Sequence, residues 1–239
     1  MSTLFPFGWL AALGFVNRCP VCNKITKREQ GFICFACSLD APYTDMWLMR
    51  DNPLEQRFWG MVPIERAASL LWYKSQGRWQ KVIHQFKYHS KHFLGEKFGY
   101  LMAAEFSKGG FFDGVDLIVP IPLHPLRRLQ RQYNQSELLA HGISRYTGIP
   151  TNFKAVRRTA NNPPQAQLHY NDRWRHTENI FDIPNPKALT GRHIVIVDDV
   201  FTSGSTLTSC AKAIYKACNG DVKISVATLA AAQYMLQEE

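Results

Sequence analysis

Two adjacent carboxylates followed by a hydroxyl-rich turn are the residues of this chain best suited to chemistry. Asp198 and Asp199 follow four apolar residues, and a turn rich in Ser and Thr leads from them into a helical pattern that runs from about Thr206 to Ala217. The N-terminus of a helix, with free backbone N–H groups and hydroxyls beside it, binds phosphate readily. Carboxylates just before it can hold sugar hydroxyls or a metal. The stretch therefore suits a phosphorylated sugar, although similar turns occur without a ligand, with the acids acting only as caps.

The same stretch resembles the 5-phosphoribosyl 1-diphosphate (PRPP) signature of the type I phosphoribosyltransferases. The signature consists of four hydrophobic residues, two acids, two small or apolar residues and T-[ST]-G-x-T, and every key position between Val195 and Thr206 is filled. By this resemblance, Asp198 and Asp199 form the catalytic acidic pair and hold the ribose hydroxyls. The residues implied for the 5′-phosphate are Thr202, Ser203, Gly204, Ser205 and Thr206.

Four cysteines near the N-terminus form two CxxC pairs. Cys19 and Cys22 are separated from Cys34 and Cys37 by eleven residues, and this spacing is typical of a zinc ribbon. Residues 31–33 fit the strand that leads into the second pair. Two disulfides or a redox pair are the alternatives, but the chain shows neither a secretory signal nor a thioredoxin-like setting. We expect structural Zn²⁺, because four protein ligands leave no open position for catalysis.

The positive charge of the chain is concentrated in its middle. The formal net charge is +9, and between Pro120 and Ile180 nine Lys or Arg face three acids. This excess raises the expectation of phosphate ligands, nucleic acid or an anionic membrane surface, with a solvated basic face as the alternative. No apolar run is long enough to cross a membrane, and Leu4 to Val16 reads as a short helix packed on the protein. We expect a cytoplasmic protein that works close to the membrane.

The hydrophobic pattern predicts an α/β fold with an open, mostly parallel sheet flanked by helices. We expect a zinc module in residues 1–42, a connector in 43–59 and a phosphoribosyltransferase-like domain in 60–239. The predicted strands are 64–73, 115–122, 150–156, 193–199 and 222–229, and the predicted helices are 77–88, 92–106, 136–146 and 206–217. Cys210 and Cys218 lie in the last helix and are expected to be core or free thiols.

A second resemblance is narrower than the first. The stretch PIPLHP…R…R-x-Y-N-Q-x-E-L-L-A, the four-cysteine module and Gln85 to Tyr88 are similar to the ComF/GntX group of the phosphoribosyltransferase superfamily. The resemblance implies a pyrophosphate-side loop in residues 120–135, with Gln132 where the group usually has Gly. The residues that it implies for pyrophosphate are Arg131, Asn134, Gln135 and Lys87.

The long polar segment 157–182 resembles the hood of the same group, which would act as a lid. Loops of this length are uncommon unless they are functional, and a surface excursion is the alternative. His176 stands where the group has Asn. The residues that the resemblance implies for the hood site are Arg158, Gln165, Arg173 and Asn179.

Two functions follow from these resemblances. In the first, the protein binds PRPP or a related phosphoribosyl ligand and handles single-stranded DNA during natural transformation, beside competence proteins at the inner membrane. Net charge and the Trp and Tyr content suit contact with single-stranded DNA. In the second, it is an active phosphoribosyltransferase of nucleotide salvage or phosphosugar metabolism. The resemblance implies Mg²⁺ with PRPP in either case.

Overall fold

A computed structural model describes residues 18–26, 32–73, 77–88, 92–123, 133–159 and 180–233. The side chains of residues 84–88, 92 and 93 are outside this description. The chain divides into two compact units, Met1–Ala41 and Pro42–Glu239. No helix in the described ranges combines the length and the apolar character that crossing a membrane requires.

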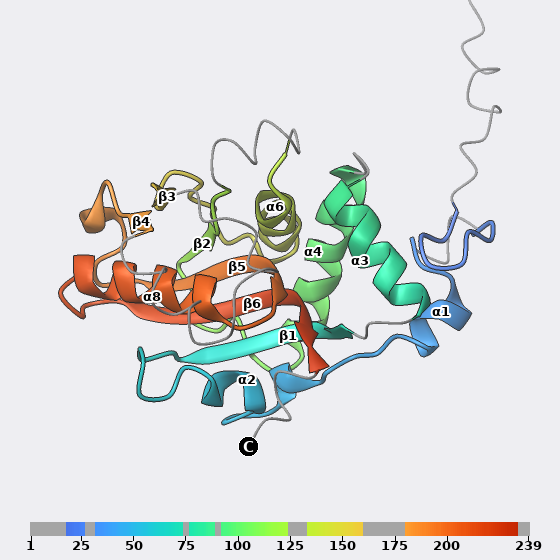
Figure 1. Ribbon diagram of the computed structural model, residues 1–239, viewed down its shortest axis with the longest axis horizontal. Helices are drawn as coiled ribbons and strands as arrows, with labels where there is room; N and C mark the ends of the chain where they lie inside the picture. The colour runs from blue at the N-terminus through green and yellow to red at the C-terminus, as the bar shows by residue number, and fades with distance from the viewer. Residues whose placement is uncertain are drawn as a thin grey trace, which may run out of the picture. The chain divides into compact units, whose positions relative to one another are not determined.

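The larger unit is built on a four-stranded parallel sheet with the order β1-β6-β5-β2 (Figure 1). The strands are β1 (Arg66–Tyr73), β2 (Leu117–Pro120), β5 (His193–Phe201) and β6 (Lys223–Ala232). Their side chains are mostly buried on both faces, which explains why they read as continuous apolar runs. The predicted α/β class with a parallel sheet is confirmed.

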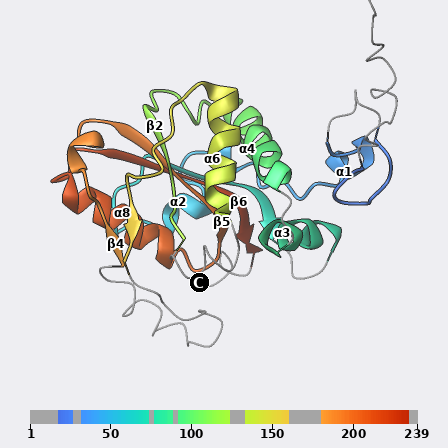
Figure 2. The same cartoon turned by 90° about the horizontal axis from the view of Figure 1, so that it is seen from above.

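Helices cover both faces of this sheet. The long ones are α3 (Arg78–Tyr88), α4 (His92–Ser107), α6 (Gln135–Thr147) and α8 (Ser205–Ala217), close to the predicted ranges. Helices α4 and α6 lie side by side, as Figure 2 shows. The crossovers from β1 to β2 and from β5 to β6 run in opposite directions across the sheet, so right-handed connections place α4 and α8 on opposite faces.

Two glycines allow α4 and α6 to approach closely. A Cβ atom on Gly99 would lie 2.1 Å from the backbone oxygen of Leu139, and one on Gly142 would lie 2.0 Å from that of Glu96. Any side chain at either position would therefore push the helices apart. This tight packing fixes α6 over β2 and β5, and α6 in turn brings its first residues to the carboxyl edge of the sheet.

The predicted strand 150–156 is reduced to one bridge. Thr151 pairs with Ile118 of β2 in parallel, and the chain then turns away. The next strand, β3 (Arg157–Arg158), pairs instead with β4 (Phe181–Asp182) in a short antiparallel ribbon. The bonds run from the Ile118 N–H to the Pro150 oxygen and from the Asn152 N–H to the Ile118 oxygen. The next bond would need an N–H group on Pro120 of β2, which proline lacks, so the pairing ends there. The two ends of the predicted hood thus meet in this ribbon.

The expected connector 43–59 contributes to the core. It forms η3 (Met46–Leu48) and α2 (Pro53–Gln56) and buries Met46, Trp47, Leu54 and Phe58. Asn52 caps α2 by accepting hydrogen bonds from the N–H groups of Leu54 and Glu55. Its amide also donates to the Ala67 oxygen at 2.9 Å, which ties the segment to β1.

The smaller unit contains a turn and a short helix. An antiparallel bridge between Arg18 and Ile25 closes the turn that carries Cys19 and Cys22. The second cysteine pair does not follow a strand as expected, because Phe32 and Ile33 lie in a bend and Cys34 is the N-cap of α1 (Phe35–Leu39). The short 3₁₀ helix η5 (Pro186–Ala188), in the larger unit, completes the named elements.

Candidate functional site

The acidic pair and the hydroxyl-rich turn lie where β5 passes into α8. β5 continues through both acids to Phe201, two residues further than predicted, since Asp198 pairs with Thr228 and Val200 with Ala230 of β6. Asp198 and Asp199 are both partly exposed. This is the carboxyl end of a central parallel strand, the usual position of ligand sites in open α/β sheets.

Gly204 makes the sharp turn between the strand and the helix possible. It is the N-cap of α8 and has a left-handed backbone with φ 74°. A Cβ atom here would lie 2.6 Å from Cζ of Phe201. Both the backbone conformation and the adjacent ring therefore require glycine.

The first turn of α8 gathers hydroxyl and N–H groups. The hydroxyls of Ser203 and Ser205 are 2.9 Å apart, and Ser203 Oγ accepts a hydrogen bond from the Ser205 N–H. The first bond of the helical ladder runs from the Thr208 N–H to the Gly204 oxygen at 2.8 Å. The two N–H groups just before it in the first turn, those of Thr206 and Leu207, have no acceptor in the helical ladder, and the dipole at this end also favours an anion. Thr202 is exposed and Thr206 half-buried at this end.

Asp198 is held in place by two hydrogen bonds to one of its oxygens. Oδ1 accepts from the Ser136 hydroxyl on α6 and from the Asp199 N–H, both at 2.9 Å. Ser136 is 3% exposed, so this bond is shielded from water. The sequence interpretation passed over Ser136, although its position just after Asn134 at the start of a predicted helix was a signal that it faced the sheet.

Asn134 and Gln135, both expected at the pyrophosphate, are 2% and 1% exposed. Asn134 is the N-cap of α6: its Oδ1 accepts from the Ser136 N–H, and its Nδ2 donates to the Ile121 oxygen at 2.9 Å. Asn134 thus joins α6 to the end of β2 and positions Ser136. In the structure, Asn134 supports the start of α6 through its hydrogen bonds, and the residue that contacts the acidic pair is Ser136.

Arg158 lies on β3, at the base of the predicted hood. Its guanidinium is over the ring of Phe181 at 5.6 Å, across the β3–β4 ribbon, and β4 packs against α8. Burial raises the pKa of the Cys210 thiol on α8; the charge of Asp198 raises it further, and that of Arg158 opposes the rise. The two charged groups therefore flank the same buried thiol. Cys210 and Cys218 are buried free thiols, as predicted.

Five of the expected site residues cannot be placed by their side chains. Lys87 belongs to α3, but its side chain is outside the description. The other four lie outside the described residues altogether, and they are Arg131, Gln165, Arg173 and Asn179.

The four cysteines of the smaller unit form a cluster that could hold a metal ion. Their sulfur atoms all lie within 4.8 Å of one another, and the Sγ atoms of Cys22 and Cys34 are 3.6 Å apart. Four sulfurs at zinc-binding distance in a tetrahedron are roughly 3.8 Å apart, so the cluster fits a tetrahedral ion. Cys19 and Cys37 are buried, and the other two are partly exposed.

The backbone around the cluster favours one thiolate. Burial raises the pKa of Cys19, but hydrogen bonds from the N–H groups of Cys34, Cys22 and Val21 outweigh it and bring the pKa to about 7. Burial raises the pKa of Cys37, and bonds with the other thiols add to this. A thiolate that forms near neutral pH is a ready first ligand, because metals bind the deprotonated form.

Comparison with known proteins identifies relatives along nearly the whole chain. The chain is 29% identical over 233 residues to the DNA utilization protein YhgH of Escherichia coli K12, covering 95% of this chain and 97% of YhgH. Competence protein F of Haemophilus influenzae is 35% identical over 102 residues, which are 42% of this chain and 44% of that protein. The chain is homologous to the ComF and YhgH proteins. Competence protein ComFC of Bacillus subtilis is another relative, 27% identical over 82% of this chain and 77% of its own length.

Two further comparisons are with protein-family profiles and with solved structures. No protein-family profile matches the chain. Among solved structures, the glutamine PRPP amidotransferase of B. subtilis, complexed with ADP and GMP, has a TM-score of 0.42 and 17% sequence identity. That match covers 61% of this chain and 30% of the amidotransferase chain. The ComF-like resemblance expected from the sequence is confirmed by the homologues.

Proposed function

We propose that the β5–α8 junction binds PRPP or a related phosphoribosyl ligand. The observation that carries this proposal is the single ordered arrangement of two partly exposed carboxylates, a left-handed glycine and a helix N-terminus within nine residues of chain. The positive helix end suits the 5′-phosphate, and the acids suit the ribose hydroxyls as acceptors. Both ends of one small ligand would then be held by one strand-turn-helix.

Each group has a distinct part in this binding. The Asp198 carboxylate, with Oδ1 held by Ser136 and Asp199, keeps its second oxygen in a fixed orientation. The first N–H groups of α8 supply donors for phosphate oxygens, beside the mutually bonded hydroxyls of Ser203 and Ser205. Arg158 adds positive charge from the β3–β4 ribbon. The donors are set by backbone and buried contacts, so little order is lost when the ligand binds.

The acidic pair also fits a divalent cation. Mg²⁺ prefers oxygen ligands and is commonly held by one or two carboxylates together with substrate phosphates. Asp198 and Asp199 offer such ligands, and both are accessible to solvent. Bound there with PRPP, Mg²⁺ would supply charge neutralisation for the diphosphate.

Calorimetric titration with PRPP and Mg²⁺ tests the proposal. We expect saturable binding that is lost when Asp198→Asn and Asp199→Asn are combined, and retained in the matched control Asp182→Asn, an exposed acid on β4. Full-strength binding in the double variant would overturn the proposal. Pyrophosphate release in the presence of a panel of nucleobases would show that the site also turns PRPP over.

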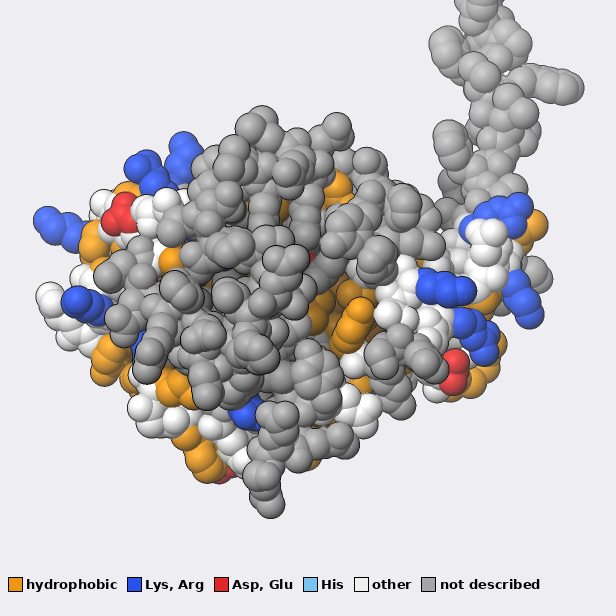
Figure 3. Space-filling view, viewed as in Figure 1, with side chains coloured by type: hydrophobic (Ala, Val, Ile, Leu, Met, Phe, Trp, Pro, Cys, Tyr) orange, Lys and Arg blue, Asp and Glu red, His pale blue; other side chains and the backbone are white. Residues whose placement is uncertain are grey.

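We also propose that the protein handles single-stranded DNA in natural transformation, in the cytoplasm close to competence proteins of the inner membrane. The names of the homologues and the net charge of +9 support this role. On the face seen in Figure 3, Lys and Arg side chains outnumber Asp and Glu in the described part. Fluorescence anisotropy with a labelled oligonucleotide should show binding that weakens steeply with salt, because phosphate contacts release counterions. Binding that is absent at low salt would contradict this role.

We propose structural Zn²⁺ for the four-cysteine cluster. The sulfur spacing and four protein ligands support it, since such a site has no open position for a reacting group. Metal analysis of the purified protein should give one zinc per chain, and a Cys22→Ser, Cys34→Ser variant should give none. Equal zinc content in both proteins would refute the assignment.

A further inference from the structure

A polar cavity lies at the opposite end of the sheet from the candidate site. Its volume is about 470 Å³, within the range of small-molecule sites. The amino ends of three strands open onto it, through Arg66 of β1, His193 of β5 and Lys223 of β6. Asp198 is five residues beyond His193 along β5, so the two sites are about 16 Å apart.

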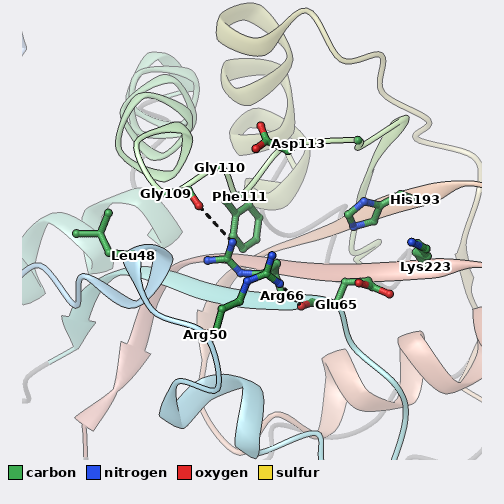
Figure 4. Close-up of a pocket in the computed structure, with 11 residues that line it drawn as sticks. Leu48, Arg50, Glu65, Arg66, Gly109, Gly110, Phe111, Asp113, His193 and Lys223 are labelled. Carbon is green, nitrogen blue, oxygen red and sulfur yellow. Dashed lines mark hydrogen bonds between the residues drawn. The ribbon is translucent and has the colours of Figure 1, made fainter.

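Arg66 is one of the residues that line this cavity and lies in the middle of them in Figure 4. It is 5% exposed, and its Nε lies 3.4 Å from the Glu55 carboxylate. Its two terminal nitrogens donate to the backbone oxygens of Trp47 at 2.7 Å and Gly109 at 3.3 Å. Arg66 is therefore a fixed, buried cation whose orientation is set by the fold.

Arg50 and Lys223 supply exposed positive charge at this cavity. Arg50 is exposed and donates one hydrogen bond, from Nη1 to the Glu65 oxygen at 3.3 Å. Burial and then the repulsive charge of nearby Arg50 lower the pKa of Arg66, while Glu55 and Asp113 oppose the shift. Within the described residues, the Lys223 ammonium makes no hydrogen bond or ion pair. An anion between these groups would relieve the repulsion and use the spare donors.

Two acids and a histidine restrict what else the ligand can carry. The carboxylates of Glu65 and Asp113 line the same cavity. His193 is already engaged, because its Nε2 lies 2.8 Å from the Ser225 hydroxyl. The cavity therefore offers donors from Arg50 and Lys223 and acceptors from the two carboxylates.

We propose that this cavity binds a small metabolite that carries one oxyanion group, a phosphate or a carboxylate, together with hydroxyl or amine groups. Arg50 and Lys223 bind the oxyanion above the fixed guanidinium of Arg66. Glu65 and Asp113 accept hydrogen bonds from the hydroxyl or amine groups. The site is separate from the β5–α8 junction and does not depend on what that junction binds.

Nuclear magnetic resonance can locate binding at this cavity. We would titrate ¹⁵N-labelled protein with glycerol 3-phosphate in one arm and glycerate in the other, and follow the backbone amides of Gly109, Gly110 and Gly114. Saturable shifts of these amides are expected in at least one arm, which identifies the phosphate or the carboxylate as the preferred group. Amides of Ser203 to Thr206 report separately on the other site.

Two exposed-residue variants test the roles of the cations. Arg50→Gln and Lys223→Gln should each weaken the shifts at the cavity glycines by at least about tenfold in Kd, while Lys212→Gln, an exposed position on α8, should leave them unchanged. All three positions are exposed, so the fold should be preserved. Absence of shifts at the three glycines in both arms, or unchanged affinity in both Arg50→Gln and Lys223→Gln, would overturn the proposal.

Discussion

Ser136 orients the Asp198 carboxylate with one nearly buried hydroxyl. Hydrogen bonds to charged groups contribute about 1.5–3 kcal/mol, and about 1.4 kcal/mol corresponds to tenfold in affinity. We therefore predict that Ser136→Ala weakens binding of PRPP with Mg²⁺ by about tenfold in calorimetry. Ser144→Ala, at a half-exposed position on the same helix, is the matched control. Equal affinity in the two variants would mean that Ser136 does not position the acid.

His193 makes folding sensitive to pH. Burial lowers its pKa; the charge of Lys223 lowers it too, and Glu65, Asp116 and a bond with the Gly114 backbone oppose the shift. As the pH falls through about 6.5, the unfolded chain takes up the proton first, so stability is present above this range and is lost below it.

His193→Gln should remove part of this loss, because an amide can keep the contact with Ser225 but does not titrate. The measurement is the urea midpoint at about pH 7.5 and about pH 5.5, on either side of the ordinary pKa of histidine. The decrease in the urea midpoint from the higher to the lower pH should be smaller in His193→Gln than in the wild type. It should also be smaller than in the control His141→Gln, which changes an exposed histidine on α6. An identical drop in all three proteins would show that His193 does not carry the dependence.

At the residue level, the sequence predicted side chains that share one continuous segment better than those that depend on tertiary packing. The arrangement of residues Asp198 to Thr206 could be predicted directly from the sequence, because the strand, the acids, the glycine and the helix start follow one another along the chain. Ser136 could not, because its contact with Asp198 joins residues sixty-two positions apart. Asn134 was recognised as special, but the sequence did not show that its amide is used to cap α6 and join β2.

Helices α4 and α6 meet through glycine, and this contact places the start of α6 against β5. In Gly142→Ala, the new methyl group would overlap the Glu96 oxygen, and overpacking of this kind costs typically 1–3 kcal/mol. We predict a loss of about 2–3 kcal/mol in the free energy of unfolding, measured with urea. Ala104→Ser, at a half-exposed position of α4, should cost only a few tenths. A stable Gly142→Ala protein would show that the helices can separate without consequence.

The element pattern was predictable where apolar periodicity was strong. All four strands of the sheet and the four long helices have the expected positions. Residues 150–156 have apolar members but only one bridge to β2, because Pro120 of β2 has no N–H group to continue the ladder beyond Asn152. Residues 43–59 lack apolar periodicity, so the sequence did not indicate that they are buried against β1. Asn52 before Pro53 is nevertheless a recognisable helix start.

At the scale of the whole molecule, the two compact units predict separate responses to metal removal. The Zn²⁺ proposed for the four-cysteine cluster would supply folding energy to the small unit, whereas the larger unit has a core of its own. A strong chelator should speed amide hydrogen exchange in α1 and leave β5 and β6 protected, as mass spectrometry of peptides can show. Protection of α1 that survives zinc loss would contradict a structural metal. Faster exchange throughout the sheet would show that the units are coupled.

The position of β6 between β1 and β5 has a consequence for synthesis on the ribosome. Arg66 of β1 pairs with Ser225 of β6. The first strand of the sheet therefore cannot form its ladder until the last described strand has been synthesised. Until residues 223–232 emerge, β1 is bridged only to the segment around Tyr43 and has no partner strand in the sheet, and β5 has one open edge. The nascent chain therefore carries unpaired strand edges from the synthesis of β1 until that of β6, and such edges are prone to aggregation. Because β6 lies between β1 and β5, the acidic pair acquires its final setting only when β6 has emerged and inserted into the sheet.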